Sequence, residues 1–285
     1  MKPLKVIIIG TGRLACACLE SCLLHTENVE CVEPENAAFS TLRSLCAKRG
    51  VKYYCLLERD ALKTFFLGCA SPTLVVSAYN SFIFPKPVLA SPWLTIVNFH
   101  NSLLPRHRGR NAPTWTIFEM DDVTGITWHR VTQEIDQGEI ICQRDLKVPS
   151  DVTAINLTQQ TLDLGAEAFR EILASLLDGT HKAVPGDRRG EETLHRSSDV
   201  PNAGILDLSW SLPKVYAFLR SLDYGKAKVF APPRVHLLGK QFVVLGYHHK
   251  LEEAIHPAGN VIEVRKDQLI LCDGGHCLKI QFRQN

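Results

Sequence analysis

The sequence predicts a mixed α/β protein, with a doubly wound and largely parallel sheet followed by a smaller, mainly β domain. Through the first half of the chain, short apolar runs alternate with segments of helical periodicity. The last quarter carries several short strand candidates separated by turns. With 285 residues, of which 45% are hydrophobic, the chain can bury one large core and one small core.

The amino-terminal residues open a βαβ pattern. Residues 6–9 are an apolar run typical of a buried strand, Gly10-Thr11-Gly12 is a tight turn, and residues 14–24 continue as a helix. Strands are predicted next near 29–32, 51–54 and 74–77, and a helix through 39–48. This alternation is expected of a doubly wound sheet.

The next strand, at 94–97, leads directly into polar residues. Asn98 and His100 are one residue apart, so on a strand their side chains point to the same face. Ligands of open α/β sheets bind beyond the carboxyl ends of the strands. Asp136 follows His100 by 136 − 100 = 36 positions, which is room for a helix and another strand. We therefore expect an amide, an imidazole and a carboxylate to lie within reach of one another.

The following segment predicts a strand and then a long helix. Residues 138–148 read as strand, and Ser150 or Asp151 is expected to cap the helix that follows. The apolar face of this helix is marked by Leu157, Leu164, Ala168 and Ile172. From about 178 to 202 the chain is polar and contains the charged run 186–192, which predicts an exposed linker.

The carboxy-terminal residues predict a small, mostly antiparallel barrel or sheet. Leu278, Ile280 and Phe282 alternate as the residues of a half-buried strand do. Strand candidates lie at 241–245, 261–264, 268–272 and 278–282, with Asp273-Gly274-Gly275 as a turn. The expected division is a first domain over 1–178, a linker over 179–202 and a second domain over 203–285.

Composition argues against several classes of partner. The formal charge of +2, from 32 basic and 30 acidic residues, gives no broad field for nucleic acid or an anionic membrane. No apolar stretch approaches the length of a membrane span, so we expect no membrane partner and a cytoplasmic location. Ten cysteines, seven of them in the first quarter, form no Cys-x-x-Cys and are expected to be mostly reduced and buried. Cys18 and Cys22 lack a second ligand pair for zinc, so no metal is expected.

The polar residues after the strand at 94–97 form a specific pattern. Asn98-x-His100 is followed by Ser102-Leu103-Leu104-Pro105 and later by Asp136-Gln137-Gly138. This resembles the folate-dependent formyltransferases, which include methionyl-tRNA formyltransferase, glycinamide ribonucleotide transformylase and the enzymes that formylate sugars or peptide-synthetase substrates. The similarity spans nearly the whole chain. It implies a Rossmann-like formyltransferase domain with a smaller, mainly β carboxy-terminal domain, and transfer of a formyl group from 10-formyltetrahydrofolate to a primary amine.

Formyl transfer explains why these residue types would stand together. The reaction passes through a tetrahedral species whose oxygen carries negative charge, while the attacking nitrogen loses a proton. Asn98 can donate to that oxygen. His100 can donate to the same oxygen or carry the proton, and Asp136 can orient His100 or take a proton through water. The sequence leaves open which of His100 and Asp136 handles the proton.

The resemblance also implies two binding regions. Folate would lie between a segment after the strand at 74–77 and a polar loop before Gly138; both are expected at the edge of the cleft. The predicted folate-binding residues are Asn80, Ser81, Phe82, Ile83, Val131, Thr132, Gln133, Glu134 and Ile135. The predicted acceptor-binding residues are Gly12, Arg13, Ser102, Arg110 and His129.

Departures from the family pattern bear on the acceptor. Asn101 stands where family members often have proline, and Thr127-Trp128-His129 replaces a more aliphatic sequence of the transfer-RNA enzyme. The segment 125–129 instead resembles the formylating domains attached to peptide synthetases. The preferred acceptor is therefore an amino acid, an amino-acid-derived amine or a carrier-bound aminoacyl group. Methionyl-tRNA, with a transfer RNA as partner, and an amino sugar remain alternatives.

Other classes of protein remain open. Gly10-Thr11-Gly12-Arg13-Leu14-Ala15 satisfies the Gly-x-Gly-x-x-Ala pattern of dinucleotide-binding folds, so an NAD-dependent dehydrogenase is an alternative. That short motif leaves Asn98, His100 and Asp136 unexplained. A non-catalytic folate-binding protein would keep the scaffold without turnover, and hydrolysis of the formyl donor would use the same three residues.

Overall fold

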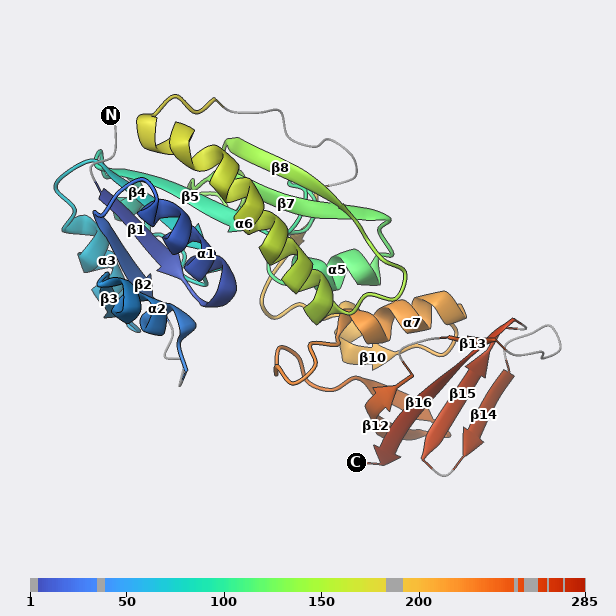
Figure 1. Cartoon of the computed structure of the whole chain (residues 1–285). Coiled ribbons are helices and arrows are strands. Elements are labelled where there is room, and N and C mark those ends of the chain that lie inside the picture. Colours follow the sequence, from blue (N-terminus) through green and yellow to red (C-terminus); the bar gives the residue numbers. More distant parts are fainter. Residues whose placement is uncertain are drawn as a thin grey trace. The chain divides into compact units, whose positions relative to one another are not determined.

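The structure is a computed structural model that describes residues 5–34, 39–182, 192–248, 251–253, 261–265, 267–273 and 275–284. The chain forms two compact units, which interleave along the sequence (Figure 1). The first comprises Met1–Gly109, Gly125–Leu146 and Gln160–Leu194; the second comprises Arg110–Thr124, Lys147–Gln159 and His195–Asn285. No helix of the described part is long and apolar enough to cross a membrane.

The first unit is built on a seven-stranded sheet of order β3-β2-β1-β4-β5-β7-β8. The first five strands of this order pair in parallel, and β7 runs antiparallel to β5. The strands are β1 (Lys5–Gly10), β2 (Val29–Glu33), β3 (Lys52–Cys55), β4 (Thr73–Ala78), β5 (Leu94–His100), β7 (Val123–Arg130) and β8 (Ile140–Lys147). The predicted doubly wound, largely parallel sheet is confirmed.

Helices cover both faces of this sheet (Figure 1). Ile8 of β1 faces a core shared with α1 (Gly12–Leu23), α2 (Thr41–Arg49) and α6 (Ala154–Asp178). Ile7 and Ile9 of the same strand face the opposite core, with α3 (Arg59–Leu67) and α4 (Lys86–Leu89). Successive strand residues thus enter different cores, because side chains alternate across a strand and both faces are covered.

The start of α6 corrects one expectation. Thr153, rather than Ser150 or Asp151, immediately precedes the helix, and its hydroxyl accepts from the N–H of Asn156 at 3.4 Å. A hydroxyl in this position satisfies an N–H that has no partner within the helix.

The second unit is mainly β, as predicted. Its sheet has the order β10-β11-β12-β16-β15-β14, with β13 paired to β16, and all its pairs except β10–β11 are antiparallel. The strands are β10 (Ile205–Leu206), β11 (Arg234–Leu237), β12 (Lys240–Tyr247), β13 (Glu252–Glu253), β14 (Val261–Arg265), β15 (Gln268–Cys272) and β16 (His276–Gln284). Leu278, Ile280 and Phe282 of β16 are buried together against α7 (Leu212–Ser221), which confirms the predicted alternation.

Short elements complete the described chain: α5 (Ala112–Phe118), η1 (Pro201–Gly204), and the two-stranded ladder of β6 (Arg108–Gly109) and β9 (Leu194–His195). Apart from Glu192, the charged run 186–192 of the predicted linker lies outside the described residues.

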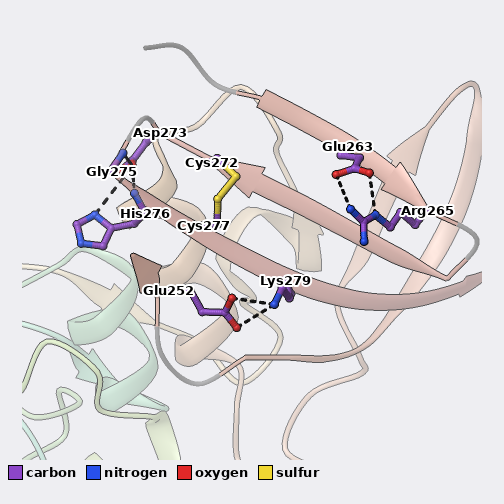
Figure 2. Close-up of a disulfide and its surroundings, with 9 residues drawn as sticks. All are labelled: Glu252, Glu263, Arg265, Cys272, Asp273, Gly275, His276, Cys277 and Lys279. Carbon is purple, nitrogen blue, oxygen red and sulfur yellow. Dashed lines mark hydrogen bonds and ion pairs between the residues drawn. A yellow bond between two sulfur atoms is a disulfide. The ribbon is translucent and has the colours of Figure 1, made fainter. Parts of the chain in front are cut away.

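The cysteines follow the prediction in part: five of the free ones are buried, Cys16 and Cys69 are half-buried, Cys55 is exposed, and two others form a disulfide. Eight are free, and Cys18 and Cys22 are buried in the core of the first unit. Burial raises the pKa of both thiols, that of Cys22 to about 12, so they stay protonated and are poor zinc ligands. Cys272 and Cys277 are register partners on β15 and β16 and are joined by a disulfide (Figure 2).

Candidate active site

Three polar side chains form a row across neighbouring strands of the first unit. In the sheet register, Ser77 of β4 lies beside Asn98 of β5, and Asn98 lies beside His129 of β7. The Ser77 hydroxyl donates to Asn98 Oδ1 at 2.6 Å, and Asn98 Nδ2 lies 3.1 Å from His129 Nε2. Ser77 and His129 are buried, whereas Asn98 keeps part of its surface exposed. Asn98 is therefore the member of this row that a ligand can reach.

His100 lies two residues beyond Asn98, at the end of β5, and is buried. Its Nε2 lies 2.8 Å from the carbonyl oxygen of His107. Since a carbonyl only accepts hydrogen bonds, Nε2 carries the hydrogen and Nδ1 is bare in the neutral ring. That Nδ1 lies 3.5 Å from Asp136 Oδ2. The ring thus presents an unprotonated nitrogen to a carboxylate.

Asp136 stands in the loop between β7 and β8, with a φ of 53° in the left-handed region that aspartate tolerates better than most residues. Its Oδ2 accepts from the Gly109 N–H at 2.7 Å, and its Oδ1 lies 3.4 Å from His129 Nε2. The carboxylate therefore lies between the imidazoles of His100 and His129.

Burial and charge set the protonation of this cluster. Burial lowers the pKa of His100 below its ordinary value of 6.5, against the opposing effects of the Asp136 carboxylate and the His107 carbonyl. Burial would raise the pKa of Asp136, yet His100, His129 and the Gly109 N–H together hold that pKa below its usual range. The directions describe a neutral His100 beside an ionised Asp136 at neutral pH. The 3.5 Å separation agrees, because it exceeds the length of a charge-assisted hydrogen bond.

Comparison with known proteins places Asn98, His100 and Asp136 within the range that matches a named family. Residues 60–173 match the family model described as formyl transferase. A methionyl-tRNA formyltransferase of Nitratidesulfovibrio vulgaris strain DP4 is 31% identical, over 80% of this chain and 72% of the relative. Another, from Caldanaerobacter subterraneus, is 26% identical over 97% of this chain and 91% of the relative.

The chain belongs to the folate-dependent formyltransferase family.

Solved structures agree in fold. The N-formyltransferase from Helicobacter canadensis, in complex with folinic acid and dTDP-3-aminofucose, has a TM-score of 0.75 and 16% identity, covering 98% of this chain and 99% of that one. HypX from Aquifex aeolicus, in complex with tetrahydrofolic acid, has a TM-score of 0.65 and 15% identity, covering 99% of this chain and 44% of that one. The predicted fold class is confirmed, and so, at the level of the family, is the expectation of a folate-dependent enzyme.

The two segments predicted to bind folate border one hydrophobic cluster of this formyltransferase. Phe82 and Val131 both pack against the core of Ile7, Ile9 and Phe66. In the same two segments, Ile83 and Ile135 are exposed. The side chain of the predicted Asn80 is already engaged: it donates to Ser77 Oγ at 3.1 Å and accepts from the Phe82 N–H at 2.8 Å. Ser81 is half-buried, and Thr132, Gln133 and Glu134 are exposed.

The residues predicted to bind the acceptor fall into different environments. Gly12, at the start of α1, has a φ of 63°, and a side chain added there would meet nothing within 4 Å. Arg13 is exposed and pairs with Asp163 at 2.9 Å. Ser102 is buried, and its hydroxyl donates to the Arg106 carbonyl at 2.6 Å. Arg110 belongs to the second unit.

The structure adds partners that the sequence analysis did not name. Ser77, the Gly109 N–H and the His107 carbonyl each bind a member of the polar cluster directly. Ser77 carried a usable signal, because it ends a predicted strand next to the strand of Asn98. The two backbone groups carried none, since every residue supplies an N–H or a carbonyl and only the fold directs it.

Proposed function

We propose that this formyltransferase moves the formyl group of 10-formyltetrahydrofolate to an amino acid, an amino-acid-derived amine or a carrier-bound aminoacyl group. The observation that carries the proposal is the bare Nδ1 of His100 beside the ionised Asp136, next to the partly exposed amide of Asn98. A proton acceptor and a hydrogen-bond donor thus stand together at the strand ends, as transfer to an amine requires.

In this mechanism the amine nitrogen attacks the formyl carbon, and the carbonyl electron pair moves to the formyl oxygen. The free N–H of Asn98 donates to that oxygen as its charge develops. The amine loses its proton to Nδ1 of His100, and Asp136 stabilises the imidazolium that forms. The tetrahedral species then collapses, the bond to N10 of the folate breaks, and N10 takes the proton from His100 as it leaves.

The same geometry supports a proposal for the folate and acceptor regions. We assign the folate to the two segments 80–83 and 131–135, which share one apolar cluster through Phe82 and Val131. We assign the acceptor side to Gly12 and Arg13, where the backbone is open and a guanidinium is exposed. A guanidinium suits an acceptor that carries a carboxylate or phosphate.

The acceptor class rests on the sequence of β7 and on charge. The segment 125–129 resembles peptide-synthetase formylating domains, and the formal net charge of +2 offers no broad basic field for a transfer RNA. Trp128 itself is a core residue: its Nε1 donates to the Gly165 carbonyl at 2.9 Å, so it makes no acceptor contact. Methionyl-tRNA is the second candidate, because the relatives at 31% and 26% identity are methionyl-tRNA formyltransferases.

The proposal is tested by incubating purified protein with 10-formyltetrahydrofolate and a panel of amines, followed by mass spectrometry. The panel contains amino acids, aminoacyl carriers, amino sugars and charged initiator transfer RNA. A formylated amino acid or aminoacyl carrier that disappears with His100→Ala supports the proposal. Formylation of only the transfer RNA or only the amino sugar would contradict the proposed acceptor class and identify the correct one. Formate release without formylated product would identify a hydrolase. Donor binding without turnover would identify a binding protein.

A further inference from the structure

The amide of Asn98 has a fixed orientation, and this can be deduced from one backbone carbonyl. His129 Nδ1 lies 2.9 Å from the carbonyl oxygen of Arg130. Because that oxygen only accepts, Nδ1 carries the hydrogen of the neutral ring and Nε2 has a lone pair. Two atoms neighbour Nε2: Asn98 Nδ2 at 3.1 Å and Asp136 Oδ1 at 3.4 Å. Of these only the amide can donate to the lone pair of the neutral ring, so Asn98 Nδ2 donates one of its two hydrogens to His129.

The other end of the amide is fixed from the opposite side. With Nδ2 directed at His129, Oδ1 of Asn98 faces the Ser77 hydroxyl at 2.6 Å and accepts from it. Ser77 can donate there because Oγ in turn accepts from Asn80 Nδ2 at 3.1 Å. All donors point the same way along this hydrogen-bonded chain, from Asn80 through Ser77, Asn98 and His129 to the Arg130 carbonyl.

The sheet register holds the central part of this chain in place. Ser77, Asn98 and His129 are direct partners across β4, β5 and β7, so their backbones are spaced by the sheet itself. Ser77 and His129 are 1% and 2% exposed, which leaves little room for substrate to reach either. The second hydrogen of Asn98 Nδ2 is donated to none of these partners. Of Ser77, Asn98 and His129, Asn98 is the one that is partly exposed, so a ligand can reach this hydrogen.

We propose that Ser77 and His129 are positioning residues, which hold the Asn98 carboxamide so that its remaining N–H is directed at the formyl oxygen. This rests on the proposed function and gives His129 a different task from direct contact with the acceptor. A preorganised donor contributes to catalysis because no reorganisation is needed when charge develops. A side chain held on both sides keeps that geometry better than one free to rotate.

Kinetics separate positioning from chemistry. Ser77→Ala and His129→Leu should each lower kcat about 10-fold, less than the roughly 100-fold or more expected on removing an oxyanion donor, with a smaller change in KM for the formyl donor. His129→Gln should recover part of the loss, since its amide oxygen can accept where Nε2 did. Ser77→Ala added to Asn98→Ala should cause little further loss, because Ser77 acts through Asn98. The pH dependence of kcat should keep the same number of limbs in both single variants, with a displaced limb in His129→Leu because His129 also adjoins Asp136.

The matched control is Thr73→Val, which removes another buried hydroxyl from β4. Thr73 donates to the Ser71 carbonyl at 2.9 Å, at the opposite end of the strand, and should leave kcat unchanged. Full kcat in Ser77→Ala or His129→Leu, an additive double variant, or loss of a titrating limb in His129→Leu would overturn the proposal.

A second measurement does not depend on activity. Nitrogen NMR of the labelled wild-type protein should show His129 with its hydrogen on Nδ1 and an unprotonated Nε2 at neutral pH. A hydrogen on Nε2 would reverse the deduced donor direction and overturn the proposal, even if no acceptor were found. If the tautomer is as deduced but no amine is formylated, the proposed function fails and the fixed orientation of Asn98 stands.

Discussion

Asp136 in the first unit and Asp273 in the second have the same kinds of neighbours but differ in burial. Each accepts hydrogen bonds from backbone N–H groups and has a histidine beside it. Asp273 takes its donors from Gly275 and His276, within three residues of itself, as Figure 2 shows. Asp136 takes its partners from His129, seven residues before it, and from Gly109 and His100, which lie 27 and 36 residues before it.

The carboxylate of Asp273 is fully solvated by its own turn and by water, whereas the carboxylate of Asp136 is not. Backbone hydrogen bonds lower the pKa of Asp273, and its side chain is 30% exposed, so water completes its solvation. The side chain of Asp136 is 11% exposed and faces two imidazole nitrogens rather than water. Local turns of this kind stabilise a loop. A buried carboxylate beside a bare imidazole nitrogen can instead take part in proton transfer.

The largest expected difference between the two sites lies in turnover. His100→Ala removes the proton acceptor and should lower kcat for formyl transfer by roughly 100 to 10,000-fold. The corresponding change beside Asp273, His276→Ala, should leave kcat at its wild-type value. Both are measured by product formation under saturating donor and acceptor. Equal losses in the two variants would mean that neither histidine belongs to the chemistry.

Removing the hydrogen-bond donor to the oxyanion should have the next largest effect on kcat. Asn98→Ala is expected to lower kcat about 100 to 1000-fold, because the oxyanion loses a preorganised N–H. Asn98→Asp keeps the shape but replaces the N–H donor with an acceptor, so it should be at least as poor. Circular dichroism of both variants establishes that they are folded. Activity near wild type in Asn98→Asp would remove the oxyanion role.

Much of the candidate active site could be predicted from the sequence. The sequence predicts Asn98 and His100 as site residues because a strand period of two places them on one face, and it predicts Asp136 because the Asp-x-Gly of the resembled family follows. Ser102 and His129 are predicted to bind the acceptor, but the sequence does not say that both are buried. Their hydrogen-bond partners, Arg106 and Asn98, depend on loop path and sheet register.

The second unit shows a similar limit. The strands were predicted from alternation, and the 278–282 candidate lies within β16. Helix α7 was missed although Leu212, Val215, Phe218 and Leu219 all enter the core at helical spacing. The disulfide was also missed, because Cys272 and Cys277 face each other only once the turn between β15 and β16 sets their register.

The pH dependence of transfer sharpens the comparison. Neutral His100 is the active form, and burial lowers its pKa below 6.5, so the acid limb that His100 contributes to kcat at saturating acceptor should be centred below pH 6.5. Asp136→Asn removes the carboxylate that raises the pKa of His100, so its acid limb should move to lower pH while its plateau falls. Asp273→Asn should leave the limb in place. A wild-type limb centred above 6.5 would contradict the neutral, buried imidazole.

The smallest effect is expected at Asp273, and it concerns stability rather than rate. Asp273→Ala removes hydrogen bonds to the N–H groups of Gly275 and His276, which cap the turn between β15 and β16. Each such bond contributes about 0.5 to 1.5 kcal/mol, and the exposed N–H groups regain water, so the free energy of unfolding should fall by about 1 kcal/mol. Urea denaturation measures this loss, and kcat should not change. A loss of kcat in Asp273→Ala with the fold intact would show that the two aspartates are not separate in function, because a turn in the antiparallel sheet would then influence chemistry at the parallel one.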